Sequence, residues 1–436
     1  MKVLKFGGTS VGSAQRMKEV AKLITDGERK IVVLSAMSGT TNTLVEISDY
    51  LYKKNPEGAN EIINKLESKY RQHIDELFAT PEYKQKGLEL IKSHFDYIRS
   101  YTKDLFTLFE EKVVLAQGEL ISTAMMNYYL QECGVKSVLL PALEYMRTDK
   151  NAEPDPVYIK DKLQIQLELH PDAEIYITQG YICRNAYGEI DNLQRGGSDY
   201  TASLIGAAIN ASEIQIWTDI DGMHNNDPRI VDKTAPVRHL HFEEAAELAY
   251  FGAKILHPTC IQPAKYANIP VRLLNTMDPT APGTLISNDT EKGKIKAVAA
   301  KDNITAIKIK SSRMLLAHGF LRKVFEIFES YQTSIDMICT SEVGVSVSID
   351  NVKHLNEILD DLKKYGTVTV DKDMCIICVV GDLEWENVGF EAKALDAMRD
   401  IPVRMISFGG SNYNISFLIR ECDKKVALQS LSNAAV

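Results

Sequence analysis

The sequence lacks the patterns by which several large protein classes are recognised. None of its 436 residues falls in a Gly-x-x-x-x-Gly-Lys-Ser/Thr or a Gly-x-Gly-x-x-Gly run, which argues against a Walker-type phosphate loop and a dinucleotide fold. No apolar run approaches the roughly 20 residues that a membrane span needs. The formal net charge is -9, with no basic domain or stripe to offset it, so we expect neither a nucleic-acid nor a membrane partner.

Cysteine is also sparse, and its spacing gives no sign of disulfide pairing. The seven cysteines are scattered, and no secretory leader precedes Lys5, so we expect a reducing, cytoplasmic location. Cys375 and Cys378 have the spacing of a metal or redox pair, but they lie in a strand-like run at residues 374–380. Residues three apart in a strand point to opposite faces, which favours two buried thiols.

A glycine-rich turn near the start of the chain is the most informative feature that is present. Residues 5–10 read Lys-Phe-Gly-Gly-Thr-Ser and follow an apolar, strand-like run. Two glycines expose consecutive backbone N–H groups and Lys5 adds a mobile positive charge, which together can hold phosphate. A helical pattern follows, with Ser13 in the N-cap position. The segment predicts a site for a nucleoside triphosphate, although a plain strand-to-helix connection would have the same pattern.

The composition and the order of predicted elements favour an α/β protein of two or three domains. Hydrophobic residues make up 45% of the chain and charged residues 25%, as in ordinary globular proteins. Strand-like runs alternate with helical patterns, which is typical of a largely parallel sheet with helices on both faces. The runs lie at residues 30–35, 137–141, 174–178, 213–218 and 269–274. We therefore expect one α/β domain over roughly the first 290 residues.

A long helical stretch interrupts this alternation at about residues 44–133. Within it, one apolar stripe is formed by Ile63, Leu66, Tyr70, Ile74 and Leu77. The stretch is compatible with a lid or flank of a substrate site, and equally with a purely structural insert.

The C-terminal part of the chain repeats its own pattern. Prolines near residue 280 and a polar stretch at residues 288–294 mark the expected boundary, which predicts domains at residues 1–292 and 293–436. Beyond it, the order strand, helix, strand, strand, helix occurs twice, at about 304–370 and 371–436. Two such units in tandem indicate a paired sensor of small molecules.

A second glycine-rich turn carries charged residues. Residues 194–199 read Gln-Arg-Gly-Gly-Ser-Asp, and a helical pattern over 200–209 follows. Arg195 has a planar guanidinium that can grip a carboxylate or a phosphate through two hydrogen bonds. Asp199 would lie at a helix N-terminus, where the helix dipole favours its ionised form. The alternative is that Ser198 or Asp199 only caps the helix.

Polar residues also follow the strand-like run at 213–218. Thr218 and Asp219 stand at its C-terminal end, where open α/β sheets bind ligands, and Asp227 and Arg229 come shortly after. These residues could hold adenine, ribose and phosphate, or they could form only a turn-rich loop. Lys254, beside glycine in a Phe-Gly-Ala-Lys run, is either a further cation for the ligand or a solvated surface lysine.

Two more segments could line a pocket for a zwitterionic small molecule. They are Gly-Glu-Leu-Ile-Ser-Thr at residues 118–123 and Ser-Ala-Met-Ser-Gly-Thr-Thr-Asn at residues 35–42. Each places hydroxyls or a carboxylate near the end of an apolar element. Taken singly, Glu119 is also compatible with a surface or capping carboxylate.

Together these motifs resemble those of aspartate kinase, of the amino-acid kinase superfamily. The resemblance rests on residues 5–12, 118–123, 195–201, 217–219 and 251–258, in the family's order and at compatible spacing. It implies a three-layer αβα, carbamate kinase-like domain followed by two α+β, ferredoxin-like ACT domains. It also implies ATP-dependent phosphorylation of the L-aspartate side-chain carboxylate to 4-phospho-L-aspartate, the first step towards lysine, threonine and methionine.

The resemblance implies roles for residues around the phosphates. Lys5 would stabilise the transferring phosphoryl group, and Asp199 would orient that lysine or the magnesium of the nucleotide. Contacts to ATP would come from Gly7, Gly8, Ser10, Gly197, Thr218, Asp219, His224, Asp227, Arg229 and Lys254. Magnesium would be held mainly by the nucleotide phosphates, with no direct protein ligand assigned.

For the acceptor, the resemblance implies contacts to all three charged groups of L-aspartate. Arg195 would bind one carboxylate and Glu119 the ammonium. Hydrogen-bonding neighbours would be Ser35, Thr41 and Ser198. Such a fixed set of partners would reject analogues that leave a buried charge unpaired.

In the first of the two repeats, the resemblance implies an allosteric pocket for an amino-acid effector. Its residues would be Met314, Gly319, Phe320, Leu321, Asp336, Ser341 and Glu342. Asp336 would pair with the ammonium of the effector, for which lysine is the first candidate. ACT repeats usually pair across a dimer, so we expect a homodimer formed through them and leave a tetramer open.

Two rival functions stay open on the sequence. A catalytically inactive amino-acid sensor would have no evident use for Lys5, Arg195 and Asp199 together. Another amino-acid kinase is disfavoured by the tandem sensor repeats and by the Arg-Gly-Gly-Ser-Asp-Tyr run at residues 195–200.

Overall fold

The structure is a computed structural model, and it describes residues 1–194, 196–251, 253, 256–311 and 318–434. The chain forms two compact units. The first comprises Met1–Met223 and Leu256–Asn288, and the second comprises His224–Ile255 and Asp289–Val436. The segment at 224–255, which the sequence analysis assigned to the first domain, thus groups with the C-terminal part. The domain boundary at 292 and 293 stays a prediction.

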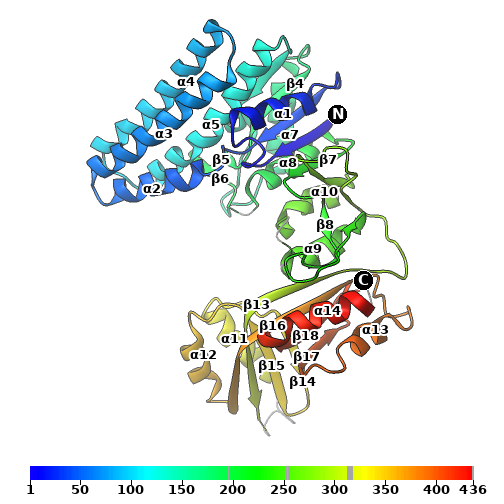
Figure 1. The fold of residues 1–436 in the computed structure, drawn as a ribbon. Coiled ribbons are helices and arrows are strands. Elements are labelled where there is room, and N and C mark those ends of the chain that lie inside the picture. Colours follow the sequence, from blue (N-terminus) through cyan, green and yellow to red (C-terminus); the bar gives the residue numbers. More distant parts are fainter. Residues whose placement is uncertain (195, 252, 254–255, 312–317, 435–436) are drawn as a thin grey trace. The chain divides into compact units, whose positions relative to one another are not determined.

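The first unit is built around a mostly parallel sheet with β1 in its interior (Figure 1). β1 (Lys2–Phe6) pairs in parallel with β2 (Lys30–Leu34) on one side and with β7 (Ile214–Thr218) on the other. Within this unit the sheet order is β12-β11-β7-β1-β2-β4-β3. The other strands are β3 (Ser137–Leu140), β4 (Ile175–Gln179), β11 (Val271–Asn275) and β12 (Thr284–Ser287). Only β12 among these strands runs antiparallel to its neighbour.

Helices cover both faces of this sheet. α5 (Leu108–Glu132) contacts β2, β3 and β4, and α1 (Ala14–Ile24) packs beside it. α8 (Gly197–Ile209) contacts β1, β2 and β7, and α7 (Pro156–Glu168) packs beside it. Shorter elements are α6 (Ala142–Tyr145), β5 (Ile182–Arg184), β6 (Ile190–Asn192), η2 (Pro258–Ile261) and α10 (Gln262–Tyr266). The three layers confirm the predicted αβα fold class.

The buried strands explain why the sequence pattern located them. Every residue of β2 and β4 is buried, as is typical of strands covered on both faces. Such strands appear in the sequence as short apolar runs, and the five runs predicted between residues 30 and 274 match the observed strands to within two residues.

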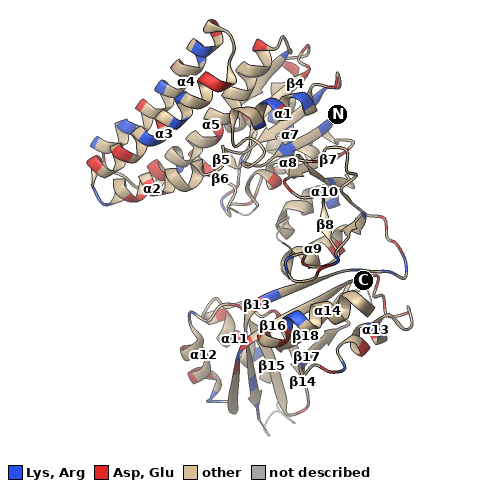
Figure 2. Ribbon diagram, in the orientation of Figure 1, with Lys and Arg blue, Asp and Glu red and all other residues tan. Residues whose placement is uncertain are grey.

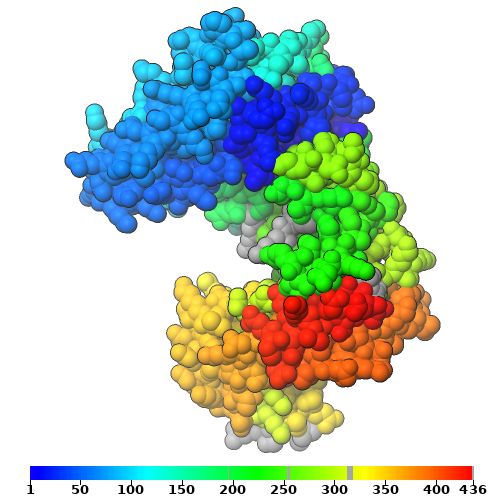
Figure 3. Space-filling view, viewed as in Figure 1, coloured from blue at the N-terminus to red at the C-terminus, as the bar shows by residue number. Residues whose placement is uncertain are grey.

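Helices α2 (Thr40–Tyr52), α3 (Pro56–Leu77) and α4 (Pro81–Ser100) precede α5 in the helical stretch, with η1 (Tyr101–Lys103) after α4. The predicted apolar stripe of α3 is buried along its whole length. Acidic and basic residues are interspersed along α3 and α4 (Figure 2), and both helices contribute to the surface of the unit (Figure 3). Among the described residues, no helix is long and apolar enough to cross a membrane.

The second unit is built around a six-stranded antiparallel sheet in the order β14-β15-β13-β16-β18-β17. Its strands are β13 (Ile295–Lys310), β14 (Met337–Thr340), β15 (Gly344–Ile349), β16 (Thr367–Gly381), β17 (Val403–Phe408) and β18 (Asn414–Arg420). Its helices are α9 (Phe242–Tyr250), α11 (Phe320–Ser330), α12 (Leu355–Leu362), α13 (Phe390–Ala397), η4 (Glu421–Asp423) and α14 (Lys424–Ala434). Short strands β8 (Met223–His224), β9 (Pro236–Val237) and β10 (His239–His241) precede α9. The predicted repeat of strand, helix, strand, strand, helix is observed twice, in order.

Two long strands are shared by both repeats, which the sequence analysis missed. It began the strands at residues 304 and 374, whereas β13 begins at Ile295 and β16 at Thr367. Residues 305–310 of β13 pair with β15 and with the start of β16, and residues 295–301 pair with the end of β16. The irregular register between Lys301 and Ile304 separates these halves. The expected limit between repeats at 370 and 371 therefore falls inside one continuous strand.

Candidate active site

The candidate site lies where the parallel strands of the first unit end. β1, β2 and β7 are parallel, so the turns that follow Phe6, Leu34 and Thr218 share one edge of the sheet. The first two turns touch, since the Ser38 N–H donates to the Gly8 carbonyl at 3.1 Å. A Cβ on Gly8 would lie 2.9 Å from the Ala36 carbonyl oxygen, so only glycine fits this approach.

Lys5 and Asp199 form an ion pair at this edge. The Lys5 Nζ lies 2.8 Å from the Asp199 Oδ1, and the two side chains are 11% and 16% exposed. Lys5 extends from β1, while Asp199 is in the first turn of α8, whose dipole favours a negative charge. A Cβ on Gly7 would lie 3.3 Å from the Lys5 Nζ, so glycine leaves the ammonium accessible from that side. The pair ties the first glycine turn to the second.

Two glycines with left-handed backbone conformations form the second glycine turn. Gly196 has φ +75° and is the N-cap of α8, and Gly197 has φ +46°. The alternative that Ser198 or Asp199 caps this helix is therefore wrong, because the helix already begins at Gly197 and no side chain of the described residues caps it. A Cβ on Gly196 would lie 1.7 Å from the Cys260 Sγ, a distance that no packing tolerates. Burial raises the pKa of that thiol to about 12.

Hydroxyl groups of three segments meet beside this turn. The Ser35 Oγ donates to the Ser198 Oγ at 2.9 Å, and the Ser122 Oγ donates to the Ser35 carbonyl at 2.8 Å. A Cβ on Gly180, after β4, would lie 2.2 Å from the Ser198 Oγ. Thr41, in the first turn of α2, is half-buried. Ser35 and Ser198, predicted from separate motifs, are thus in direct contact.

Glu119 is a buried carboxyl group with spare bonding capacity. It lies within α5, and its Oε1 accepts a long hydrogen bond of 3.4 Å from the Ala36 N–H. The side-chain Oε2 has no hydrogen-bond partner among the described residues. Burial raises the pKa of Glu119 to about 8, because the site offers its charge little compensation. A cation entering the site would relieve this cost.

Thr276 joins the end of β7 to the first glycine turn, and the sequence analysis missed it. Its N–H donates to the Thr218 carbonyl at 2.8 Å, and its Oγ1 lies 3.3 Å from the Ser10 Oγ. The signal was present, since Thr276 comes two residues after the predicted strand at 269–274 and so lies at the same edge. Asp219, by contrast, is exposed.

Three of the predicted contacts to ATP belong to the second unit of the chain. His224, Asp227 and Arg229 belong to the second unit, where the His224 Nδ1 lies 2.9 Å from the Thr234 Oγ1. Arg229 pairs with Asp227 at 2.9 Å, and its hydrogen bond holds the pKa of that carboxyl below its usual range. Arg195 and Lys254 are outside the described residues. The roles of all five at the nucleotide or substrate stay predictions.

The predicted effector residues lie in the second unit, around the start of α11 and the turn between β14 and β15. Gly319, with φ +82°, is the N-cap of α11, Phe320 is buried and Leu321 is 38% exposed. Ser341 and Glu342 are exposed in the β14–β15 turn, and Met314 is outside the described residues. Asp336 precedes β14 and already pairs with Lys301 at 3.1 Å.

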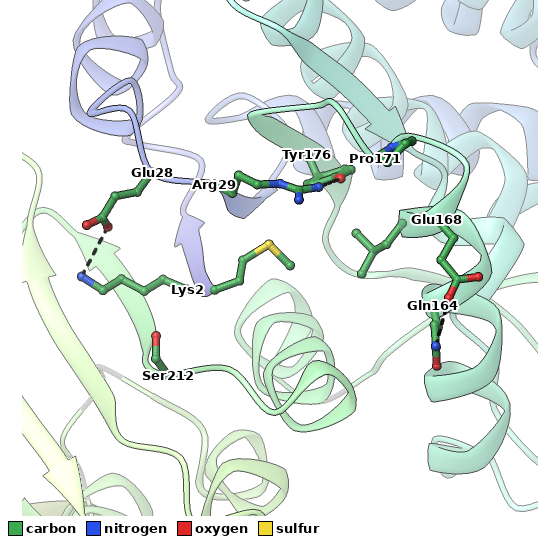
Figure 4. Close-up of a pocket in the computed structure, with 10 residues that line it drawn as sticks. Lys2, Glu28, Arg29, Gln164, Glu168, Pro171, Tyr176 and Ser212 are labelled. Atoms are coloured by element: carbon green, nitrogen blue, oxygen red, sulfur yellow. Dashed lines mark hydrogen bonds and ion pairs between the residues drawn. The ribbon is translucent and has the colours of Figure 1, made fainter.

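A cavity of about 760 Å³ lies at the opposite edge of the first unit's sheet (Figure 4). Lys2, Arg29 and Tyr176, which line it, stand at or near the beginnings of β1, β2 and β4. The candidate site is therefore separate from this cavity. No group of three metal-binding side chains occurs among the described residues.

Comparisons with known proteins agree with this arrangement. Residues 1–275 match the amino acid kinase family, and residues 377–434 match the ACT domain. Aspartokinase 1, chloroplastic, of Arabidopsis thaliana is 36% identical over 98% of this chain and 79% of its own length. The crystal structure of E. coli aspartokinase III in complex with aspartate and ADP (R-state) has a TM-score of 0.82 at 31% identity, over 99% of both chains. The complex of that enzyme with lysine and aspartate (T-state) has a TM-score of 0.80 at 32% identity, over 100% of this chain and 99% of the other.

Replacing Gly196 with alanine should destabilise the first unit well beyond the cost of a left-handed alanine. Gly188 is the matched control, since its φ is +79° and a Cβ there would meet nothing within 4 Å. We expect Gly188→Ala to cost about 1–2 kcal/mol, and Gly196→Ala about 1–3 kcal/mol more through its clash with Cys260. Urea unfolding of both variants measures the difference. Equal stability of the two variants would show that the close approach to Cys260 is not a constraint.

Proposed function

Because this chain belongs to the aspartokinase family, we propose that it transfers the γ-phosphoryl group of ATP to the side-chain carboxylate of L-aspartate. The product is 4-phospho-L-aspartate, the first intermediate towards lysine, threonine and methionine. The observation that carries the proposal is the ion pair of Lys5 and Asp199 between two glycine-rich turns, at the sheet edge where ligands bind.

The chemistry needs charge neutralisation rather than a strong base. A carboxylate oxygen of aspartate is already ionised and attacks the γ-phosphorus, while the bond from that phosphorus to the β,γ-bridging oxygen breaks and ADP leaves. The Lys5 ammonium offsets the negative charge on the transferring group. Asp199 holds the ammonium in place at 2.8 Å and need not take a proton.

The glycine turns serve the phosphates of ATP. Gly7, Gly8 and Gly197 leave their backbone N–H groups open to anions, and Ser10 adds a hydroxyl. Magnesium would be held mainly by the nucleotide phosphates and would neutralise part of their charge, and Asp199 would orient either that ion or Lys5. Remaining contacts to the nucleotide are assigned to Thr218, Asp219, His224, Asp227, Arg229 and Lys254.

Both the carboxylates and the ammonium of aspartate have assigned partners. Arg195 binds one of its carboxylates, and Glu119 binds its ammonium. The free Oε2 of Glu119 and the raised pKa of the group support this role, because an ammonium supplies the charge that the buried carboxylate lacks. Neutral contacts come from Ser35, Thr41 and Ser198.

The second unit senses an amino-acid end product. Its ACT repeats bind the effector, for which lysine is the first candidate, and pair across a homodimer, with a tetramer as a further possibility. The protein acts in the cytoplasm. Inhibition follows if the effector binds one of two arrangements of the enzyme more tightly than the other.

The direct test is release of ADP by the purified protein with magnesium-ATP and L-aspartate. We expect turnover with L-aspartate, none with L-glutamate, and suppression by L-lysine, L-threonine or L-methionine. Turnover with L-glutamate instead would identify another amino-acid kinase. Amino-acid binding without any turnover would identify an inactive sensor, and either result would reject the proposal.

Lys5→Ala should lower kcat by about 10²–10³-fold while the fold is retained, because it removes charge stabilisation from the transition state. Lys2→Ala is the matched control, since Lys2 lies on the same strand with its side chain 40% exposed. Steady-state kinetics and circular dichroism of both variants make the comparison. A folded Lys5→Ala enzyme as active as the Lys2→Ala enzyme would reject the role of Lys5.

The KM for L-aspartate should fall as pH rises towards the pKa of Glu119. An ammonium binds the ionised carboxylate, and with a pKa of about 8 the group must first lose a proton at lower pH. Apparent affinity then improves by up to about tenfold per pH unit below the pKa and levels off above it. Glu119→Gln should bind L-aspartate weakly and without this pH dependence. A wild-type KM that is flat from about pH 6.5 to 8.5 would contradict the assignment.

A further inference from the structure

One lysine in the second unit is shared between two carboxylates. The Lys301 Nζ lies 3.1 Å from the Asp336 Oδ1 and 2.9 Å from the Asp350 Oδ2. The Tyr250 hydroxyl donates to the same Asp336 oxygen at 2.9 Å, and the ammonium lies 4.5 Å from the centroid of the Tyr250 ring. We call these four residues the Lys301 cluster.

The Lys301 cluster carries more negative than positive charge. One ammonium faces two carboxylates, and the Asp336 side chain has no exposed surface. Its Oδ2 is buried without a hydrogen-bond partner among the described residues. Burial and the neighbouring Asp350 raise the pKa of Asp336, against the opposing effect of Lys301. A buried carboxylate in this state gains from a second ammonium beside it.

Tyr250 connects this cluster to a helix that contacts both repeats. It is the last residue of α9, and α9 packs on β13 and β16. Glu247, one turn earlier, forms hydrogen bonds with Asn414 and Ser411 next to β18. The helix is thus held by the second repeat through Glu247 and by the first through Tyr250.

The chain continues from α9 directly into the Phe-Gly-Ala-Lys run. Lys254, assigned above to the phosphates of ATP, follows Tyr250 four positions later in the sequence. The end of α9 is thus adjacent in sequence to a residue assigned to the nucleotide.

We propose that Tyr250 links the effector site to the kinase, because its hydroxyl and the ammonium of an amino-acid effector compete for Asp336. This inference rests on the proposed regulation of the kinase by an amino acid and names the residue that reports effector binding. When the ammonium of the effector pairs with Asp336, the hydrogen bond from Tyr250 is lost and the C-terminus of α9 is released. Without effector the bond holds the C-terminus of α9 on the first repeat, next in sequence to the residues assigned to ATP.

The test is Tyr250→Phe in the full-length protein, which removes only the hydroxyl and keeps the ring beside Lys301. Tyr331→Phe is the matched control, since the Tyr331 hydroxyl donates to the Asp361 Oδ2, also at 2.9 Å, in the same unit. Calorimetry with L-lysine, L-threonine and L-methionine measures effector affinity, and ADP release measures the ratio of uninhibited to fully inhibited rate.

Loss of the competing hydroxyl should tighten effector binding by about threefold or more, the size expected for one partly exposed hydrogen bond. The same change should reduce the inhibition ratio, since α9 is already released. Unchanged values in Tyr250→Phe, or weaker binding, would overturn the proposal. Failure of all three amino acids to bind the wild-type protein would also overturn the proposal. ADP release measured without effector tests the proposed kinase function separately.

A second variant tests the charge balance of the cluster independently. Asp350 has a side chain that is 39% exposed, so Asp350→Asn should fold, and it leaves Lys301 to neutralise Asp336 alone. We expect effector affinity to fall by about two- to fivefold, as for a partly exposed ion pair. Asp361→Asn serves as the control. Equal affinity in both variants would overturn the role of the excess negative charge.

Discussion

The ion pair of Lys5 and Asp199 is the interaction on which the candidate active site depends. It connects the C-terminal end of β1 to the first turn of α8, two elements almost 200 residues apart in the sequence. The pair can form because β1 and β7 are parallel neighbours and because Gly196 and Gly197 adopt left-handed conformations that start α8 at the right point. Both glycine turns therefore face the same space, with a fixed cation between them.

Buried carboxylates recur in the two units with the same electrostatic property. Glu119 in the first unit and Asp336 in the second each have one oxygen without a hydrogen-bond partner in the described part of the chain, and burial raises the pKa of both groups. Such buried carboxyl groups are tolerated where a bound ligand supplies the missing hydrogen bond and the opposite charge. In our account an amino acid's ammonium does so in both places, as substrate at Glu119 and as effector at Asp336. The chain would thus recognise an amino acid at two sites through the same interaction, a buried carboxylate that pairs with the ligand's ammonium.

Local features of both units could be predicted from the sequence, and features that depend on packing could not. The buried strands and the glycine turns at Gly7 and Gly197 follow from neighbouring residues, as does the repeated order of elements in the second unit. The contact of Thr276 with Ser10 and the pairing of Lys301 with Asp336 arise only when distant segments pack together. The length of β13 was missed for the same reason, since its first half is stabilised by β16.

The measurement that tests the central claim most directly is a double-mutant cycle on kcat with Lys5→Ala, Asp199→Asn and the double variant. If the two side chains act as one unit on the transferring phosphoryl group, the second substitution adds little to the first, and the interaction free energy reaches about 1 kcal/mol or more. Effects that add to within about 0.5 kcal/mol would show that Lys5 and Asp199 act independently, and would contradict the account.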